Sequence, residues 1–170
     1  MAWPFTFDTE RLRAERLRTD HLPELRRMHT DARVMAHLGG VFTEEQSVAY
    51  LARNLAHWDT HQHGLWIIYE RHGVEPIGRG LLRHMLLDDV DEVETGYAFY
   101  ETYWGRGYAT ELTRASLALG FERLALRSIV AVTAPQNAAS QHVLLKCGLR
   151  LDRQFQRGDE TLCLFRIHRT

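Results

Sequence analysis

Hydrophobic positions along the chain follow two periods, one typical of strands and one typical of helices. Alternating or continuous apolar runs predict strands at residues 10–18, 65–70, 77–85, 92–100, 128–133, 150–155 and 160–168. Apolar positions three and four residues apart predict four helices, beginning near residues 19, 43, 107 and 136, with a shorter turn at 31–38. The chain therefore alternates between the two kinds of element from end to end.

Local signals place several of the boundaries. Thr43 to Gln46 reads as a capping box and predicts a helix that runs to about residue 57 or 59. Thr19 or Asp20 is expected to cap the first helix, with Pro23 in its first turn. Gly148 is expected to end the last helix, and the turns at 71–76 and 156–159 predict two hairpins.

The resulting order is β-α-α-β-β-β-α-β-α-β-β, which predicts an α/β fold with a mixed sheet. A helix separates strands 92–100 and 128–133, so these two strands are expected to be parallel. No linker or repeat interrupts the pattern, and we expect a single domain over residues 1–170. Residues 1–8 are expected to form an N-terminal arm, in which Trp3, Phe5 and Phe7 alternate.

Composition narrows the class of protein. Apolar residues make up 45% of the 170 residues, as in a globular core, and the net charge of −1 argues against a nucleic-acid partner. No signal peptide and no membrane-length apolar run is seen, so we expect a cytoplasmic protein without a membrane partner. Cys147 and Cys163 are then expected to be reduced, small apolar residues.

Ten histidines are scattered along the chain, and three of them lie close together. His57 and His61 have the i,i+4 spacing of a metal-binding pair, with His63 next to them. Asp59 faces elsewhere on the same helix, and no cysteine lies nearby to complete a ligand set. We therefore interpret this group as a solvated helix end and expect no metal.

The stretch from Tyr103 to Glu111 carries the clearest chemistry. It follows a strand, contains Gly105 and Gly107, and leads into a helix. Glycines let a ligand approach the main chain, and the free N–H groups of a helix start attract anions, so this turn predicts a phosphate cradle. It lacks the lysine and Ser/Thr of a nucleotide P-loop and the full dinucleotide fingerprint, which argues against an enzyme that binds ATP with Mg²⁺.

Trp104 to Ala109 resembles the acetyl-CoA-binding motif of the GNAT N-acetyltransferases, although Trp104 stands where the family usually has Gln or Arg. The resemblance covers nearly the whole chain from Thr9 onward and is closest to the RimJ/RimL-like branch. It is carried by residues 9–12, 94–97, 103–111 and 137–140, the last followed by 146–149.

The resemblance implies a splayed sheet that holds acetyl-CoA as cosubstrate, with pantetheine at Ala98, Phe99 and Tyr100. It implies further cofactor contacts from Trp104, Gly105, Arg106, Gly107, Tyr108, Ala109, Thr110 and Asn137. Ser140 would interact with the thioester sulfur as a catalytic residue. The family's general-acid tyrosine is replaced by Leu144. From the residues alone, Asn137 reads as a helix N-cap, Ser140 as a helix surface residue and Arg106 as a solvated turn residue.

Glu94 is the candidate general base, acting directly or through water, and the alternative is a structural ion pair with an arginine. Glu92 shares its strand parity but is a weaker candidate. Tyr97 and Tyr100 are expected to be wall or core residues. Trp66, Met35 and Phe42 could line the acceptor side, and core packing is the default expectation for each. The acidic run 88–92 is read as a solvated turn rather than the rim of an acceptor groove.

The predicted activity is acetyl transfer from acetyl-CoA to a primary amine in a ternary complex. The amine belongs either to a protein N-terminus or to a small molecule. The alternative from another class is a non-catalytic acyl-CoA-binding sensor or interaction module. Members of the family are often homodimers, and the sequence leaves that state open.

Overall fold

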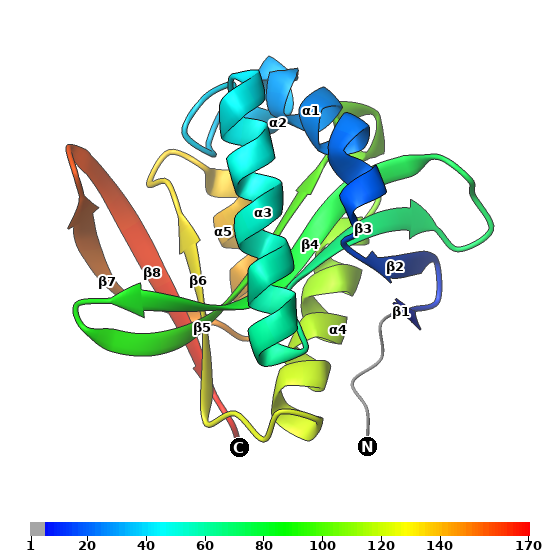
Figure 1. Cartoon of the computed structure of the whole chain (residues 1–170). Coiled ribbons are helices and arrows are strands. Elements are labelled where there is room, and N and C mark those ends of the chain that lie inside the picture. The colour runs from blue at the N-terminus through cyan, green and yellow to red at the C-terminus, as the bar shows by residue number, and fades with distance from the viewer. Residues whose placement is uncertain (1–5) are drawn as a thin grey trace.

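The structure is a computed structural model that describes residues 6–170, and an eight-stranded mixed sheet runs through it (Figure 1). The strands lie in the order β1-β2-β3-β4-β5-β6-β8-β7. Their bounds are β1 Thr6–Asp8, β2 Leu12–Arg16, β3 Leu65–Glu70, β4 Pro76–Leu87, β5 Val90–Phe99, β6 Ser128–Thr133, β7 Arg150–Arg157 and β8 Glu160–His168.

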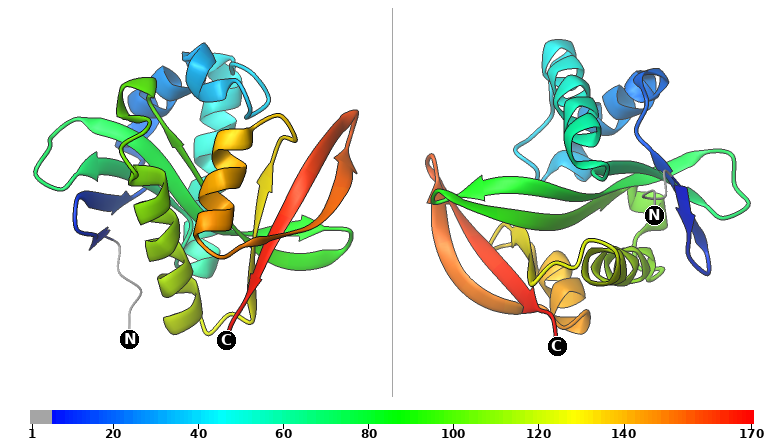
Figure 2. Two further views of the ribbon diagram at one scale, coloured as in Figure 1. Left: turned by 180° about the vertical axis from the view of Figure 1, so that it is seen from behind. Right: turned by 60° about the horizontal axis from the view of Figure 1, so that its bottom comes forward.

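Helices cover both faces of this sheet. The first face carries α1 (Leu22–Thr30), α2 (Ala32–Met35) and α3 (Glu44–His61), and the other carries α4 (Tyr108–Glu122) and α5 (Ala138–Lys146) (Figure 2). Short 3₁₀ turns precede α1 (Thr19–His21) and α4 (Glu101–Tyr103). Within residues 6–170, no helix combines the length and apolarity needed to cross a membrane.

The predicted elements are confirmed, with local corrections at the start of α1 and in the N-terminal arm. The box at Thr43 and Gln46 caps α3 as expected, and β3 and β6 have the predicted bounds. The expected cap of α1 by Thr19 or Asp20 is wrong. These two residues lie in the 3₁₀ turn, and the N-cap of α1 is His21.

Part of the expected N-terminal arm is a strand. Thr6–Asp8 pairs antiparallel with β2, and the Phe7 ring meets Trp66 edge-on at a centroid distance of 5.3 Å. Trp3 and Phe5 lie outside the described residues. Phe7 therefore belongs to an edge strand packed on the body of the protein.

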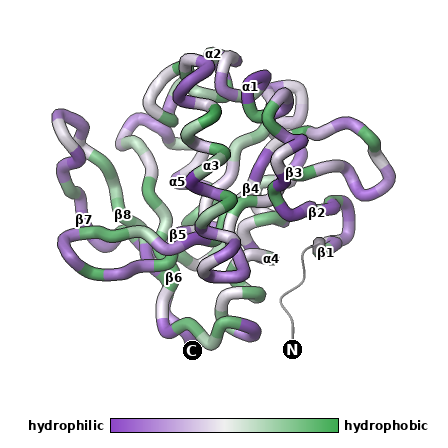
Figure 3. The backbone as a smooth tube through the Cα atoms, in the orientation of Figure 1, coloured by the Kyte–Doolittle hydropathy of each residue, from purple (hydrophilic) through white to green (hydrophobic). Residues whose placement is uncertain are grey.

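The core lies on both sides of β3 and β4. Trp66, Ile67 and Ile68 of β3 are fully buried, because helices cover both faces of this central part of the sheet. Met35 is buried as well, and Phe42 packs against the core, so the prediction of core packing for these residues is confirmed. Figure 3 shows a different pattern at the far edge of the sheet, where β8 is largely hydrophobic and the edge strand β7 beside it is largely hydrophilic.

The sheet opens between its two parallel strands. The register of β5 with β6 has a single pair, Glu94 with Val130, and the strands diverge from there (Figure 1). Both the parallel pairing and the splay expected from the resemblance are thus present. Main-chain groups of β5 beyond Glu94 face a gap whose upper end meets the start of α4.

Candidate active site

The turn before α4 has the backbone conformation that a phosphate cradle needs. Gly105 and Gly107 have φ values of +72° and +81°, which glycine adopts without steric penalty. Gly107 is the N-cap of α4, and the first helical hydrogen bond runs from Glu111 N–H to Gly107 O at 3.0 Å. The N–H groups of residues 107–110 precede that bond and have no partner within the helix, so they are available to an anion.

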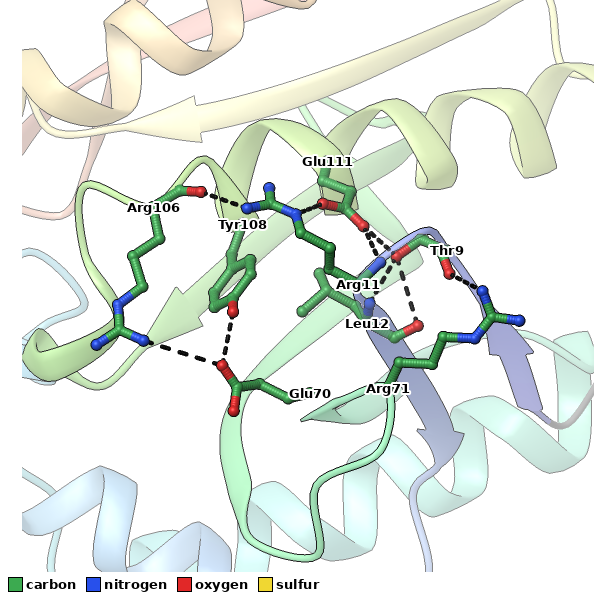
Figure 4. A network of polar contacts seen from close by, with 8 residues as sticks. All are labelled: Thr9, Arg11, Leu12, Glu70, Arg71, Arg106, Tyr108 and Glu111. Atoms are coloured by element: carbon green, nitrogen blue, oxygen red, sulfur yellow. Dashed lines mark hydrogen bonds and ion pairs between the residues drawn. The ribbon is translucent and has the colours of Figure 1, made fainter.

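A polar network fixes this turn from the N-terminal side (Figure 4). Glu111 accepts hydrogen bonds from the Thr9 hydroxyl, from Arg11 N–H at 2.8 Å and from Arg11 Nε at 2.7 Å. Arg11 Nη1 also donates to the carbonyl of Arg106 at 2.8 Å. Burial opposes the ionisation of Glu111, but the bonds from Thr9 and Arg11 outweigh it and lower the pKa of this carboxyl. The network holds the cradle in shape.

Arg11 is a candidate site residue that the sequence reasoning missed. A Cβ at Gly107 would lie 3.3 Å from Arg11 Nη2, so the guanidinium borders the cradle directly. Arg71 lies in the same network, donating from Nη1 to the Thr9 carbonyl at 3.2 Å. The match of residues 9–12 to the family motif was a signal for this role, but nothing in the sequence showed that the stretch would meet α4.

Tyr108 and Arg106 surround the cradle in different ways. The Tyr108 hydroxyl donates to Glu70 at 2.6 Å, and this bond, with burial, raises the pKa of the phenol. Its side chain is buried, so Tyr108 offers a ligand its main-chain N–H rather than its ring. Arg106 is exposed and lies 3.9 Å from Glu70 and over the Tyr103 ring, which keeps a positive charge at the turn.

The end of β5 supplies the wall of the gap. Tyr100 N–H donates to Ile77 O of β4, and successive residues of a strand alternate in direction, so the main chain of Phe99 faces the side away from β4. There the Phe99 carbonyl accepts from Trp104 Nε1 at 2.8 Å. Ala98 and Tyr100 are buried, and the Tyr100 hydroxyl donates to Glu24. Trp104, which stands where the family usually has Gln or Arg, therefore places its indole against the end of β5, where pantetheine is predicted to bind.

Across the gap, α5 brings a hydroxyl toward β5. Asn137 is the N-cap of α5, and its side chain accepts from Ser140 N–H at 3.2 Å, as the residues alone suggested. Ser140 is half-buried, and its Oγ lies 3.0 Å from the Tyr97 hydroxyl. Burial raises the pKa of Tyr97, and its bond to Ser140 opposes that shift. Tyr97, expected as a wall or core residue, is thus hydrogen-bonded to the predicted catalytic serine.

Glu94 lies at the closed end of the gap and is paired with an arginine. Arg83 Nε and Nη2 both contact Glu94 Oε2 at 3.3 Å, and the Glu94 side chain is only 14% exposed. The alternative of an arginine partner is therefore present in the structure. Because side chains alternate along a strand, Glu94 and Tyr97 approach the gap from opposite faces of β5.

The acidic run at residues 88–92 is largely paired. Glu92 accepts two bonds from Arg166, at 2.7 and 2.9 Å, and these bonds raise the pKa of the guanidinium. Asp88 pairs with Arg153, and both oxygens of Asp91 contact His84 Nδ1. Glu92 thus connects β5 to β8 through its ion pair with Arg166.

The interpretation of His57 and His61 as a solvated helix end is wrong. His63 beside them is only 2% exposed, and His57 is half-buried with both ring nitrogens hydrogen-bonded to main chain. Burial, followed by the neighbouring His61, lowers the pKa of His57 to about 4. These rings form an ordered cluster.

Comparisons with known proteins agree with this geometry. The family model described as Acetyltransferase (GNAT) domain matches residues 11–150. The uncharacterized N-acetyltransferase YnaD of Bacillus subtilis is 30% identical over 129 residues, which is 75% of this chain and 72% of that protein. A solved acetyltransferase from Agrobacterium tumefaciens is 30% identical with a TM-score of 0.86, covering 99% of this chain and 96% of the other.

The ribosomal-protein α-N-acetyltransferase RimL, solved in complex with coenzyme A, shares the fold at a TM-score of 0.76 and 15% identity, over 97% of this chain and 96% of the other. With the family model spanning most of the chain and the cradle in place at the splayed strands, this protein belongs to the GNAT acetyltransferase family and is an acetyl-CoA-dependent N-acetyltransferase.

Proposed function

We propose that this protein transfers the acetyl group of acetyl-CoA directly to a primary amine in a ternary complex, as an enzyme of the RimJ/RimL-like branch. One observation carries the proposal. The gap between β5 and β6 has the cradle at one end, Glu94 at the other, and the Tyr97–Ser140 pair between its walls. This arrangement provides an anion site, a main-chain wall, one group that can accept a proton and a pair of hydroxyls that can donate one.

The cofactor fits this gap by its chemistry. Its pyrophosphate would lie on the N–H groups of residues 107–110, where Arg11 and Arg106 add positive charge. The pantetheine arm would extend along the outward-facing main chain of Phe99, next to the Trp104 indole. Asn137 would act mainly by holding the first turn of α5 in place, because its side chain caps that helix.

The leaving thiolate needs a proton. The amine nitrogen attacks the thioester carbonyl carbon, the C–S bond breaks, and the sulfur takes a proton while the amine releases one. Ser140 is proposed to donate that proton, with the Tyr97 hydroxyl donating in turn to Ser140 Oγ at 3.0 Å. Tyr97 lies on β5 and would thereby take over the role of the general-acid tyrosine that the family has on α5 at the position of Leu144.

The amine must also lose a proton, and Glu94 is proposed to accept it through a water molecule. Both Arg83 contacts fall on Oε2, so the water would bind to Oε1. Glu94 approaches from the face of β5 opposite to Tyr97, which separates the group that accepts a proton from the group that donates one.

The acceptor amine belongs to a protein N-terminus or to a small molecule. An α-amine, with an unperturbed pKa of about 7.7–8.0, loses its proton more readily than an alkylamine and needs the weaker base. Asp88 and Glu92 of this run pair with arginines, which offsets part of the charge that a polycationic acceptor would need. These points favour a protein N-terminal α-amine.

The test begins with calorimetric titration of the parent and of Gly107→Glu with acetyl-CoA. The variant places a carboxylate in the cradle, and we expect it to abolish micromolar binding. Gly158→Glu makes the same substitution in the distant β7–β8 turn and should bind like the parent. Absence of binding in the parent would overturn the proposal.

Turnover is then followed as thiol release with peptides bearing different N-termini and with small amines. Glu94→Gln and Ser140→Ala should each lower kcat while acetyl-CoA binding is kept. Tight binding of acetyl-CoA without thiol release from any amine in the parent would instead favour the acyl-CoA sensor.

A further inference from the structure

Four histidines from three parts of the chain converge where α3 ends and β3 begins. His57 and His61 come from the last turns of α3, His63 from the connection to β3, and His84 from the second half of β4. The ring centroids of His61 and His84 are 4.0 Å apart, and His63 lies 5.3 Å from His84 and 5.9 Å from His61. This group takes no part in the proposed acetyl transfer.

Hydrogen bonds separate His57 from the other three. Its Nδ1 lies 2.8 Å from the His63 carbonyl, and its Nε2 accepts from His84 N–H at 2.9 Å. Both nitrogens are therefore occupied by main chain. His57 thereby holds the main chain at His63 and at His84 in place.

The bonds of His63 and His84 select one tautomer. His63 Nδ1 lies 2.6 Å from the Leu82 carbonyl, and His84 Nδ1 lies 2.9 Å from the Asp91 carboxylate. Oxygens of a carbonyl or carboxylate can only accept, so Nδ1 carries the proton in each ring and the lone pair resides on Nε2. Metal-binding histidines in proteins are oriented by the same kind of carbonyl or carboxylate partner.

We propose that His61, His63 and His84 form a binding site for a divalent transition-metal ion, with Zn²⁺ as the first choice. One ring nitrogen from each of the three lies within 4.8 Å of the others. Tetrahedral Zn–N bonds of about 2.0–2.1 Å put such nitrogens about 3.3 Å apart, so the rings must turn to close the site, and His61 must leave its stacked position on His84. Three imidazoles suit Zn²⁺, Ni²⁺ or Cu²⁺ and disfavour Mg²⁺ and Ca²⁺, which prefer oxygen ligands.

The position of the site indicates its role. A bound ion would join the end of α3 to β4 beyond Leu81, where β3 no longer pairs with β4. It would also fix His84, the neighbour of Arg83, which contacts Glu94. The ion would therefore stabilise the fold and hold β4 in place, the strand whose Arg83 contacts the proposed base Glu94.

The experiment uses the full chain without an affinity tag. Zn²⁺ binding is measured by competition with a chromophoric chelator for the parent, for His61→Ala, for His84→Ala and for Asp91→Asn. His72→Ala, in the exposed β3–β4 turn, is the matched control. We expect one Zn²⁺ per chain in the parent and in the control, at least tenfold weaker binding in each histidine variant, and about 10–100-fold weaker binding in Asp91→Asn.

Two further readouts keep the test independent of folding. Circular dichroism confirms that each variant is folded, and Co²⁺ absorption reports the ligand type. Nitrogen-ligated cobalt should give d–d bands without a sulfur charge-transfer band, which excludes Cys147 and Cys163 as ligands. No Zn²⁺ binding by the parent, equal affinity in the His61→Ala and His72→Ala variants, or a sulfur band would each overturn the proposal.

Discussion

Replacing Glu111 with glutamine tests whether the network around the cradle stabilises the fold. In the parent, Oε1 accepts from the Thr9 hydroxyl and from Arg11 N–H, and Oε2 accepts from Arg11 Nε. Glu111→Gln keeps the size and one oxygen. It removes the charge and sets an NH₂ group against the Nε–H donor, so one bond is lost and two are weakened.

The magnitude follows from these three bonds. Hydrogen bonds to a charged group contribute about 1.5–3 kcal/mol each, and those between neutral groups about 1 kcal/mol. The Glu111 side chain is 16% exposed, but that of Arg11 is 45% exposed, so solvent screens the ion pair and the upper end of this range does not apply. We expect a loss of about 2 kcal/mol in the free energy of unfolding and a decrease in Tm of about 4–8 °C.

The pH dependence supplies a second signature. Because the pKa of Glu111 is lowered in the folded state, its contribution is present above the unfolded value of 4.5 and is lost as the pH falls through the lowered value. The difference between parent and variant, measured by urea unfolding, should therefore shrink between about pH 5 and pH 3.

The control is Glu122→Gln, an exposed residue at the other end of α4, which should change stability by less than about 0.5 kcal/mol. Equal stability of Glu111→Gln and the parent at pH 7 would refute the reasoning. So would a deficit that stays constant down to pH 3.

Three further predictions concern other parts of the molecule. Gly105→Ala and Gly158→Ala place a Cβ at φ values of +72° and +59°, with no atom within 4 Å of it. Each variant should therefore lose about 1–2 kcal/mol of stability through backbone strain. Only Gly105→Ala should also weaken acetyl-CoA binding, by roughly tenfold in a calorimetric titration. Equal affinity in both would argue against the cradle. Tyr97→Phe removes the hydrogen-bond partner of Ser140 and should lower kcat at least ~10-fold with unchanged acetyl-CoA affinity; an unchanged kcat would exclude its part in protonating the thiolate. His29 is fully buried, and burial followed by the charge of Arg79 lowers its pKa to about 4. The unfolded chain thus takes up the proton first, and stability should fall as pH decreases from about 6.5 to 4, by up to ~1.4 kcal/mol per pH unit from this residue. Urea unfolding of His29→Gln should show a shallower slope in that window, and an identical slope would contradict the assignment.

Prediction from the sequence succeeded where the signal is local. The strand at 65–70 is a continuous apolar run because both of its faces are buried, and its bounds are those of β3. The capping box of α3 lies within four residues, and the cradle follows from two glycines placed between a strand and a helix. The cap of α1 was misplaced because the sequence did not distinguish a 3₁₀ turn from the first turn of the helix.

The sequence by itself thus determined the order of the elements, the parallel strand pair and the place of the cradle, since periodicity, caps and turns depend on neighbouring residues. Tertiary structure alone decided which distant side chains meet. Arg11 reaches Glu111 across 100 positions, Tyr97 reaches Ser140 across 43, and His84 reaches His57 across 27. Those meetings depend on strand register and on how each helix lies across the sheet, which the packing of the whole core sets and no short stretch encodes.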